Sequence, residues 1–174
     1  MTDSRLMVEV DRVLPASPAT VYRALTEPEL YQRWMGPDGS VTTIEEMDLR
    51  IGGRLAFRVR LPDHDLEFGI HGFYEEIEPQ RRLVHSWLVE GDDDVSTVAM
   101  TLEPAGTGTR LLITHHGLTS PEDVSQNQGG WTHQLDRLEA VLATVAWAHP
   151  HLPASDEAAS HPSSRAPRTP RPRR

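Results

Sequence analysis

Cysteine and lysine are both missing from this chain of 174 residues, so all 17 basic residues are arginine. Without cysteine the chain has no thiolate nucleophile, no disulfide, no cysteine-ligated zinc and no iron–sulfur cluster. Without lysine it has no Schiff base and no phosphate-binding P-loop of the usual kind. Histidines, carboxylates and hydroxyls are therefore the side chains left to carry any chemistry.

Long apolar runs are absent as well. No segment approaches the roughly 20 consecutive apolar residues that a membrane-spanning helix needs, and the N-terminus lacks the apolar stretch of a signal peptide. With 37% hydrophobic residues and a mean hydropathy of -0.47, the composition is that of a soluble protein with one core. We therefore expect a cytoplasmic protein without a membrane span.

Positive charge is scarce in most of the chain and concentrated at its end. Residues 1–152 contain 12 arginines and 24 acidic residues, so this part should repel the phosphates of nucleic acids. Residues 153–174 contain five arginines among Pro, Ser and Ala, with no large apolar side chain. Burial could not offset the entropy of ordering such a segment. We expect one domain over 1–152 and a disordered tail over 153–174, whose arginines are solvated or touch an anionic surface.

The first 37 residues predict one strand and two short helices. Alternating apolar residues indicate a half-buried strand from Leu6 to Leu14. Ser17 followed by Pro18 is typical of a helix start, with serine as the N-cap. A second short helix follows the break at Pro28 and ends at Gly36-Pro37.

The rest of the chain predicts six further strands and one long helix. The strands lie at about 41–49, 53–61, 66–77, 82–90, 95–103 and 109–116, where short alternating segments are separated by turn residues. The helix runs from about Gln126 to Ala148, because apolar residues form one stripe there: Trp131, Leu135, Leu138, Leu142 and Val145. We predict an α+β helix-grip (START-like) fold, in which a curved seven-stranded antiparallel sheet surrounds a long C-terminal helix and two short helices follow strand 1.

Five segments carry a family resemblance: SPATVYRALTEPELYQRWMGP (17–37), EMDLRIGGRLAFRV (46–59), GFYEEIEPQRRLVHSW (72–87), TRLLITHHGL (109–118) and GGWTHQLDRLEAVL (129–142). Together they resemble the bacterial proteins similar to activators of the ninety-kilodalton heat-shock chaperone's ATPase (AHSA-type), within the START-like, Bet v 1-like (SRPBCC) superfamily. The resemblance covers nearly all of residues 5–149. It implies an apolar ligand cavity between sheet and helix, and its known relatives include polyketide cyclases and hydroxylases and proteins that act on chaperones.

Loop motifs and histidine spacing predict neither a cofactor nor a metal. The Gly-x-Gly at Gly106–Gly108 joins two strands and lacks the third glycine and the helix of a dinucleotide site. Asp92–Asp94 does not match a calcium loop. The nine histidines include no HExxH or similar spacing, and the adjacent His115 and His116 point to opposite faces of a strand. We expect no metal and no cofactor.

Four polar residues are candidates for acid–base chemistry. Parity places His71, Glu75 and His85 on the concave face of neighbouring strands, and His115 shares the parity of the apolar residues on its own strand. A buried histidine or glutamate needs a hydrogen-bond partner, because its desolvation without one costs about 2 kcal/mol or more. The four could satisfy one another, hydrogen-bond the polar end of a ligand, or act as acid and base.

Seven residues are predicted to line the ligand cavity: Trp34, Phe57, Phe73, Trp87, Met100, Trp131 and Leu135. The first function that we expect is the binding of a small hydrophobic or aromatic molecule. A polyketide cyclase-like enzyme and a chaperone-regulating or protein-partner domain are the alternatives, and a homodimer is a further assembly. An oriented carboxylate–histidine pair facing a cavity would favour the enzyme, whereas an exposed apolar patch would favour the protein partner.

Overall fold

The computed structural model describes residues 6–148. In chain order the elements are β1 (Leu6–Leu14), α1 (Pro18–Thr26), α2 (Pro28–Trp34), β2 (Val41–Met47), β3 (Arg54–Leu61), the 3-10 turn η1 (Pro62–His64), β4 (Leu66–Glu78), β5 (Arg82–Val89), β6 (Ser96–Ala105), β7 (Gly108–Leu118) and α3 (Pro121–Ala148). Within this part of the chain no helix is both long and apolar enough to cross a membrane. The expected tail at 153–174 lies outside the described residues and stays a prediction.

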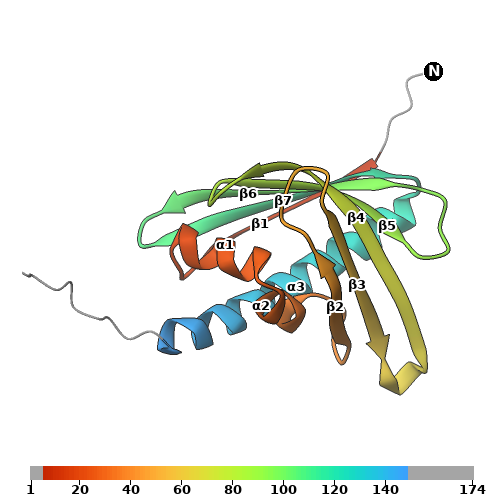
Figure 1. Cartoon of the computed structure of the whole chain (residues 1–174), viewed down its shortest axis with the longest axis horizontal. Coiled ribbons are helices and arrows are strands. Elements are labelled where there is room, and N and C mark those ends of the chain that lie inside the picture. Colours follow the sequence, from red (N-terminus) through yellow and green to blue (C-terminus); the bar gives the residue numbers. More distant parts are fainter. Residues whose placement is uncertain (1–5, 149–174) are drawn as a thin grey trace, which may run out of the picture.

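The seven strands form one antiparallel sheet in the order β1-β7-β6-β5-β4-β3-β2. Consecutive strands pair with each other from β2 to β7, and β1 pairs with β7 at the edge of the sheet. Figure 1 shows the sheet bent around α3, with α1 and α2 on the same side of the sheet as α3. This arrangement confirms the predicted α+β helix-grip fold.

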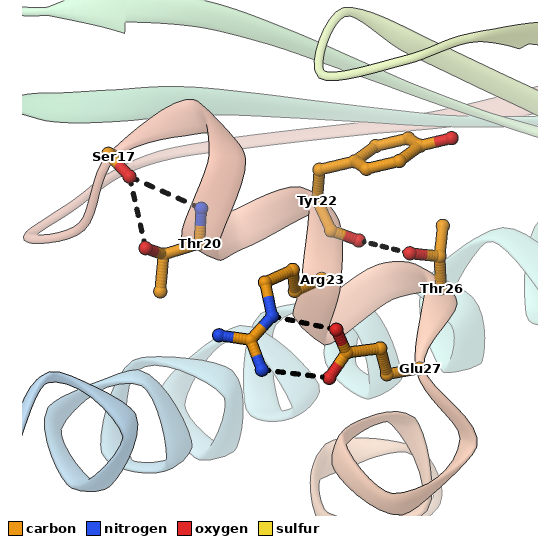
Figure 2. A network of polar contacts seen from close by, with 6 residues as sticks. All are labelled: Ser17, Thr20, Tyr22, Arg23, Thr26 and Glu27. Atoms are coloured by element: carbon orange, nitrogen blue, oxygen red, sulfur yellow. Dashed lines mark hydrogen bonds and ion pairs between the residues drawn. The ribbon is translucent and has the colours of Figure 1, made fainter. Parts of the chain in front are cut away.

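Side chains close in sequence form hydrogen bonds at both ends of helix α1. The Ser17 hydroxyl accepts a hydrogen bond from the Thr20 N–H at 3.2 Å and so caps the helix as predicted. At the other end the Arg23 guanidinium donates to both carboxylate oxygens of Glu27, at 2.7 and 3.1 Å (Figure 2). Glu27 also separates α1 from α2, so this pair lies at the turn that directs α2 toward the sheet.

Helix α3 begins five residues earlier than predicted, at Pro121 rather than Gln126. Ser120 and Asp123 cap it reciprocally: the Asp123 N–H donates to the Ser120 hydroxyl at 3.1 Å, and the Ser120 N–H donates to the Asp123 carboxylate at 2.9 Å. Apolar spacing missed this first turn because Val124 is the only large apolar residue before Trp131. The capping pattern Ser-Pro-x-Asp was the signal that marks the start.

An arginine interrupts the apolar face of β1. Arg12 has the parity of the buried Val8 and Val10, yet its guanidinium forms an ion pair with Asp136 and lies 3.6 Å from a carboxylate oxygen of Glu139, both on α3. The charge is therefore matched by the helix that covers this face. The pairing joins the edge strand to α3.

A β-bulge interrupts β4 beside β5. Tyr74 lies opposite His85, but Glu76, two residues further on, lies opposite Val84, which is only one residue back. Glu75 is therefore an extra residue in β4. An extra residue reverses which face the side chains on either side of it occupy.

The bulge changes the face assigned to three predicted site residues. Their placement on the concave face followed from the parity of Ile77, which lies beyond the bulge. Before the bulge it is Tyr74 that is buried, at 2% exposure, whereas Phe73 is 50% exposed. Glu75 is exposed and His71 is half-buried, with the outward parity of Phe73. The prediction that His71, Phe73 and Glu75 lie on the concave face was wrong.

Candidate functional site

A pocket of about 290 Å³ lies between the sheet and α3. Its sheet wall is apolar and consists of Phe57, Val59, Phe68, Ile70, Trp87 and Val89. Its helix wall consists of Gln126, Asn127, Gly130, Trp131 and Gln134, and residues 35–37 close one end. The volume is at the lower end of the range that small-molecule sites occupy. The pocket therefore suits a compact ligand, apolar on one side and able to meet amides on the other.

A series of aromatic rings, each packed against the next, extends from the core to this pocket. The ring centroids are 5.7 Å apart for Tyr31 and Phe57, 5.6 Å for Phe57 and Trp87, and 5.6 Å for Trp87 and Trp131. Tilted and edge-on pairs of this kind stabilise a core by about 0.5–1.5 kcal/mol each beyond their burial. Because neighbouring rings hold one another, the aromatic part of the pocket wall is preorganised.

A hydrogen-bond chain around His115 joins the Trp131 side chain to the Trp87 backbone. The Trp131 indole N–H donates to His115 Nδ1 at 3.1 Å, so the ring proton is on Nε2. Nε2 donates to the Ser96 hydroxyl at 2.7 Å, and that hydroxyl donates to the Trp87 carbonyl at 3.2 Å. The chain thereby connects α3 with β7, β6 and β5.

This chain requires a neutral His115. Burial, followed by the nearby His85 and His116, lowers the pKa of His115 to about 4. A proton on Nδ1 would remove the acceptor that the Trp131 N–H uses. The geometry and the lowered pKa therefore agree that His115 is uncharged near neutral pH.

His85 lies on the same face of the sheet as His115 and is 2% exposed. Burial lowers its pKa, so it too is neutral near pH 7. Its Nδ1 lies 3.0 Å from the Ser86 carbonyl, and its ring stacks on Trp87 with centroids 6.0 Å apart. The Tyr74 ring packs edge-to-face with the His85 ring, also with centroids 6.0 Å apart. His85 thus supports the aromatic wall from the core side.

Three of the seven predicted wall residues, Phe57, Trp87 and Trp131, line the pocket. The other four do not line it. Trp34, Met100 and Leu135 are buried in the core, and Trp34 donates its indole N–H to the Ala24 carbonyl at 2.9 Å. Phe73 points outward, as described above.

Among the described residues, no carboxylate pairs with any of the four acid–base candidates. Glu75 is exposed, and the one histidine–carboxylate contact in this part of the chain, between His133 and Asp38 at 3.8 Å, involves none of the four. His85 and His115 are brought near each other and near the pocket, whereas His71 and Glu75 are not. The oriented pair that would favour an enzyme is absent from the described part of the chain.

Sequence reasoning missed most of the pocket wall. Val59, Phe68, Ile70 and Val89 each follow the inward alternation of their strands. On β4, however, the residues before the bulge were assigned to the opposite face of the sheet. The amides of α3 lie on the predicted helix, but they were missed because only apolar residues were expected in the cavity wall.

A second, polar hollow of about 480 Å³ adjoins the first. The two share Trp87, Val89 and Asn127, and the second is also lined by His115 and by acidic residues of the loop 92–94. Asp123, at its rim, is occupied in capping α3. Within residues 6–148 no group of three or more His, Asp or Glu side chains is arranged to hold a metal ion.

An exposed apolar corner lies where the β2–β3 turn meets β4. Ile51 is 69% exposed and Phe73 is 50% exposed. Backbone bonds hold the two segments together, since the Gly52 N–H donates to the Tyr74 carbonyl at 2.7 Å and the Tyr74 N–H donates to the Gly53 carbonyl at 3.0 Å. This corner is the kind of feature that the protein-partner alternative predicts.

Comparison with known proteins agrees with the fold. No curated protein matches the chain. The structure of protein CV1439 from Chromobacterium violaceum is 27% identical, with a TM-score of 0.72, over 78% of this chain and 96% of that one. Protein NE0264 from Nitrosomonas europaea is 26% identical, with a TM-score of 0.68, over 80% and 96%. DynU16, from the dynemicin biosynthetic locus, is 24% identical over 80% of this chain and 48% of its own, with a TM-score of 0.65, and shares the fold.

The family comparison covers most of the helix-grip domain. The model that matches describes the Activator of Hsp90 ATPase homolog 1-like protein family, and the match spans residues 15–143. It includes α1, α2, six of the strands and most of α3, and therefore every residue that lines the pocket. The chain belongs to the Activator of Hsp90 ATPase homolog 1-like protein family.

Proposed function

We propose that this protein binds a compact aromatic or apolar molecule in the pocket between the sheet and α3. The observation that carries the proposal is a hollow of about 290 Å³ between the sheet and α3, bordered by the buried rings of Phe57, Trp87 and Trp131. The hollow is open to solvent and its sheet wall is apolar, so a ligand that covers this wall would remove apolar surface from water. The surrounding rings are held by one another and by His115, which reduces the entropy lost on binding.

Binding without turnover accounts for the polar groups beside the pocket. Both nitrogens of His115 are engaged in hydrogen bonds, and His85 is neutral and stacked on Trp87. Neither has a carboxylate partner among the described residues. These features favour a rigid wall over a site for proton transfer.

The volume sets the size and affinity of a test ligand. A bicyclic molecule such as 2-naphthol has about 11 non-hydrogen atoms, and at roughly 0.4 kcal/mol per atom it would bind with about 4 kcal/mol, or a Kd near 1 mM. Larger natural ligands would gain affinity only by extending into the adjoining polar hollow through Asn127 and Val89.

Titration of the ¹⁵N-labelled protein with 2-naphthol, followed by amide chemical shifts, tests the proposal. We expect saturable shifts centred on β3 to β5 and the first half of α3. Val89→Phe, which extends a half-buried side chain into the pocket, should weaken binding at least tenfold. Val13→Phe on the exposed face of β1 is the matched control and should leave the Kd unchanged. Shifts confined to the Ile51–Phe73 corner, or none at millimolar ligand, would reject the pocket as the site.

A further inference from the structure

Helix α3 carries two consecutive glycines, Gly129 and Gly130, in its interior. Glycine inside a helix is less stable than alanine because the unfolded chain has more freedom to lose. A glycine is retained there when a side chain would collide with something, when the backbone needs a positive φ, or when the space is needed. The surroundings of the two residues distinguish these reasons.

Neither glycine is required by the packing of the protein itself. Neither has a positive φ. A Cβ built on Gly129 would meet no atom within 4 Å, and one built on Gly130 would meet only the Gln134 side-chain nitrogen, at 4.0 Å. The two differ in what they face: Gly129 is exposed, whereas Gly130 lines the pocket between the sheet and α3.

Gly130 is the gap in a row of amide side chains. Gln126, Gly130 and Gln134 are spaced by four residues, so they share one face of α3, and all three line the pocket. Without a side chain at the middle position, a ligand can reach the helix backbone between the two amides. A flat molecule lying there would have the aromatic and aliphatic side chains of the sheet wall against its other face.

The row also contains an acceptor without a donor. Gln134 Oε1 is buried and has no hydrogen-bond partner among the described residues. A buried acceptor without a donor is unfavourable, so rotation of the terminal amide toward a donor in the pocket would be favourable. The corresponding group on a ligand is an N–H or O–H at the edge of its ring.

We propose that the pocket selects planar aromatic molecules that carry an N–H or O–H donor, with Gly130 leaving the room for the ring and Gln134 accepting the hydrogen bond. The inference rests on the proposed function, since it concerns the ligand of the same pocket. It assigns the ligand class and two specificity-determining residues.

The glycine pair supplies its own control. Gly129→Ala and Gly130→Ala both add one methyl group to the same helix, and both should raise the melting temperature by similar amounts. Only Gly130→Ala should weaken binding of indole, the donor-bearing probe, by at least tenfold, while Gly129→Ala should change it less than twofold. A Gly130→Ala variant that melts lower than wild type would show that this glycine serves the backbone and would overturn its assigned role.

A matched pair of probes tests the donor. Indole offers a ring N–H and quinoline offers a ring nitrogen acceptor, and the two are similar in size. Amide chemical-shift titration of the full chain should give a Kd for indole at least fivefold lower than for quinoline, and Gln134→Met should remove that preference. Equal affinity in wild type, or a preference that survives Gln134→Met, would overturn the donor assignment while leaving the pocket as a binding site. If wild type bound neither of these probes nor 2-naphthol, the proposed function and this inference would fail together.

Discussion

At the scale of single residues, His115 shows how one buried polar group can organise a wall of aromatic rings. It accepts a hydrogen bond from Trp131 and donates one to Ser96, and only the neutral ring can do both. Its effect on stability should therefore depend on pH. Because its pKa falls to about 4 in the folded state, the unfolded chain, with a pKa near 6.5, binds the proton more readily.

The lowered pKa of His115 makes the free energy of unfolding fall as the pH falls. The stabilisation is complete above about pH 6.5 and is lost as the pH falls toward 4, amounting to about 2 kcal/mol between pH 7.5 and pH 5. Urea unfolding at the two pH values, compared with His115→Gln, measures it. We expect His115→Gln to remove this contribution and to leave the acid sensitivity that the lowered pKa of His85 adds. His116→Gln, on the exposed neighbouring residue, should keep both. Equal acid sensitivity in His115→Gln and wild type would contradict this account.

Residue-level prediction from the sequence succeeded where strands alternate regularly. His85, Trp87, Phe57 and His115 all lie on the expected face of the sheet. It failed on β4, because the bulge at Glu75 shifts the alternation by one residue and nothing in the composition of the segment marks it. Burial alone also did not distinguish pocket wall from core, since Trp34 is as apolar as Trp87 but is fully buried, with its indole N–H bonded to Ala24 of α1.

At the scale of elements, α3 determines whether a pocket exists. Its C-terminal half packs its stripe of apolar residues into the core, whereas its N-terminal half presents amides and Gly130 to the hollow. The 4-3-4-3 spacing revealed the first of these halves to sequence reasoning. In the N-terminal half, the turn before Gln126 has Val124 as its one large apolar residue, so only the capping residues Ser120 and Asp123 mark that turn.

The packed half of α3 should be sensitive to truncation on one face only. Leu138 is completely buried, so Leu138→Ala should destabilise by about 2–5 kcal/mol through the cavity it leaves. Glu139→Ala should lower the free energy of unfolding by less than about 1 kcal/mol. The Glu139 carboxylate is half exposed, and its contact with Arg12, at 3.6 Å, is a surface ion pair. Chemical denaturation of both variants measures the difference. Similar losses for the two would show that the buried face of α3 has been assigned incorrectly.

At the scale of the whole molecule, the order of elements decided the fold. One strand, two short helices, six strands and a long helix could be recognised from turn residues, caps and periodicity. From β2 to β7 the sheet order follows from consecutive strands pairing antiparallel, whereas β1 joins the sheet beside β7. The pocket could not be derived in this way, because its volume depends on how far α3 lies from β3 to β5 and on the absence of a side chain at one position. Distances of that kind are set by the packing of all the elements together.

The domain should be independent of the segment after it. Residues 153–174 lack large apolar side chains, so they have little to bury against residues 1–152. Deleting 153–174 should change the melting temperature by less than about 4 °C. A larger fall, measured by thermal denaturation of the two chains side by side, would mean that the tail docks on the domain.

The central claim is that a small aromatic molecule fills the space between the sheet and α3. A crystal structure of the protein grown with 2-naphthol tests it most directly, because the ring and the side chains around it can be located together. We expect electron density for the ligand in the pocket, against the rings of Trp87 and Trp131, with His115 still bonded to Trp131. A pocket closed by movement of α3 onto Phe57, or ligand density only elsewhere on the molecule, would contradict it.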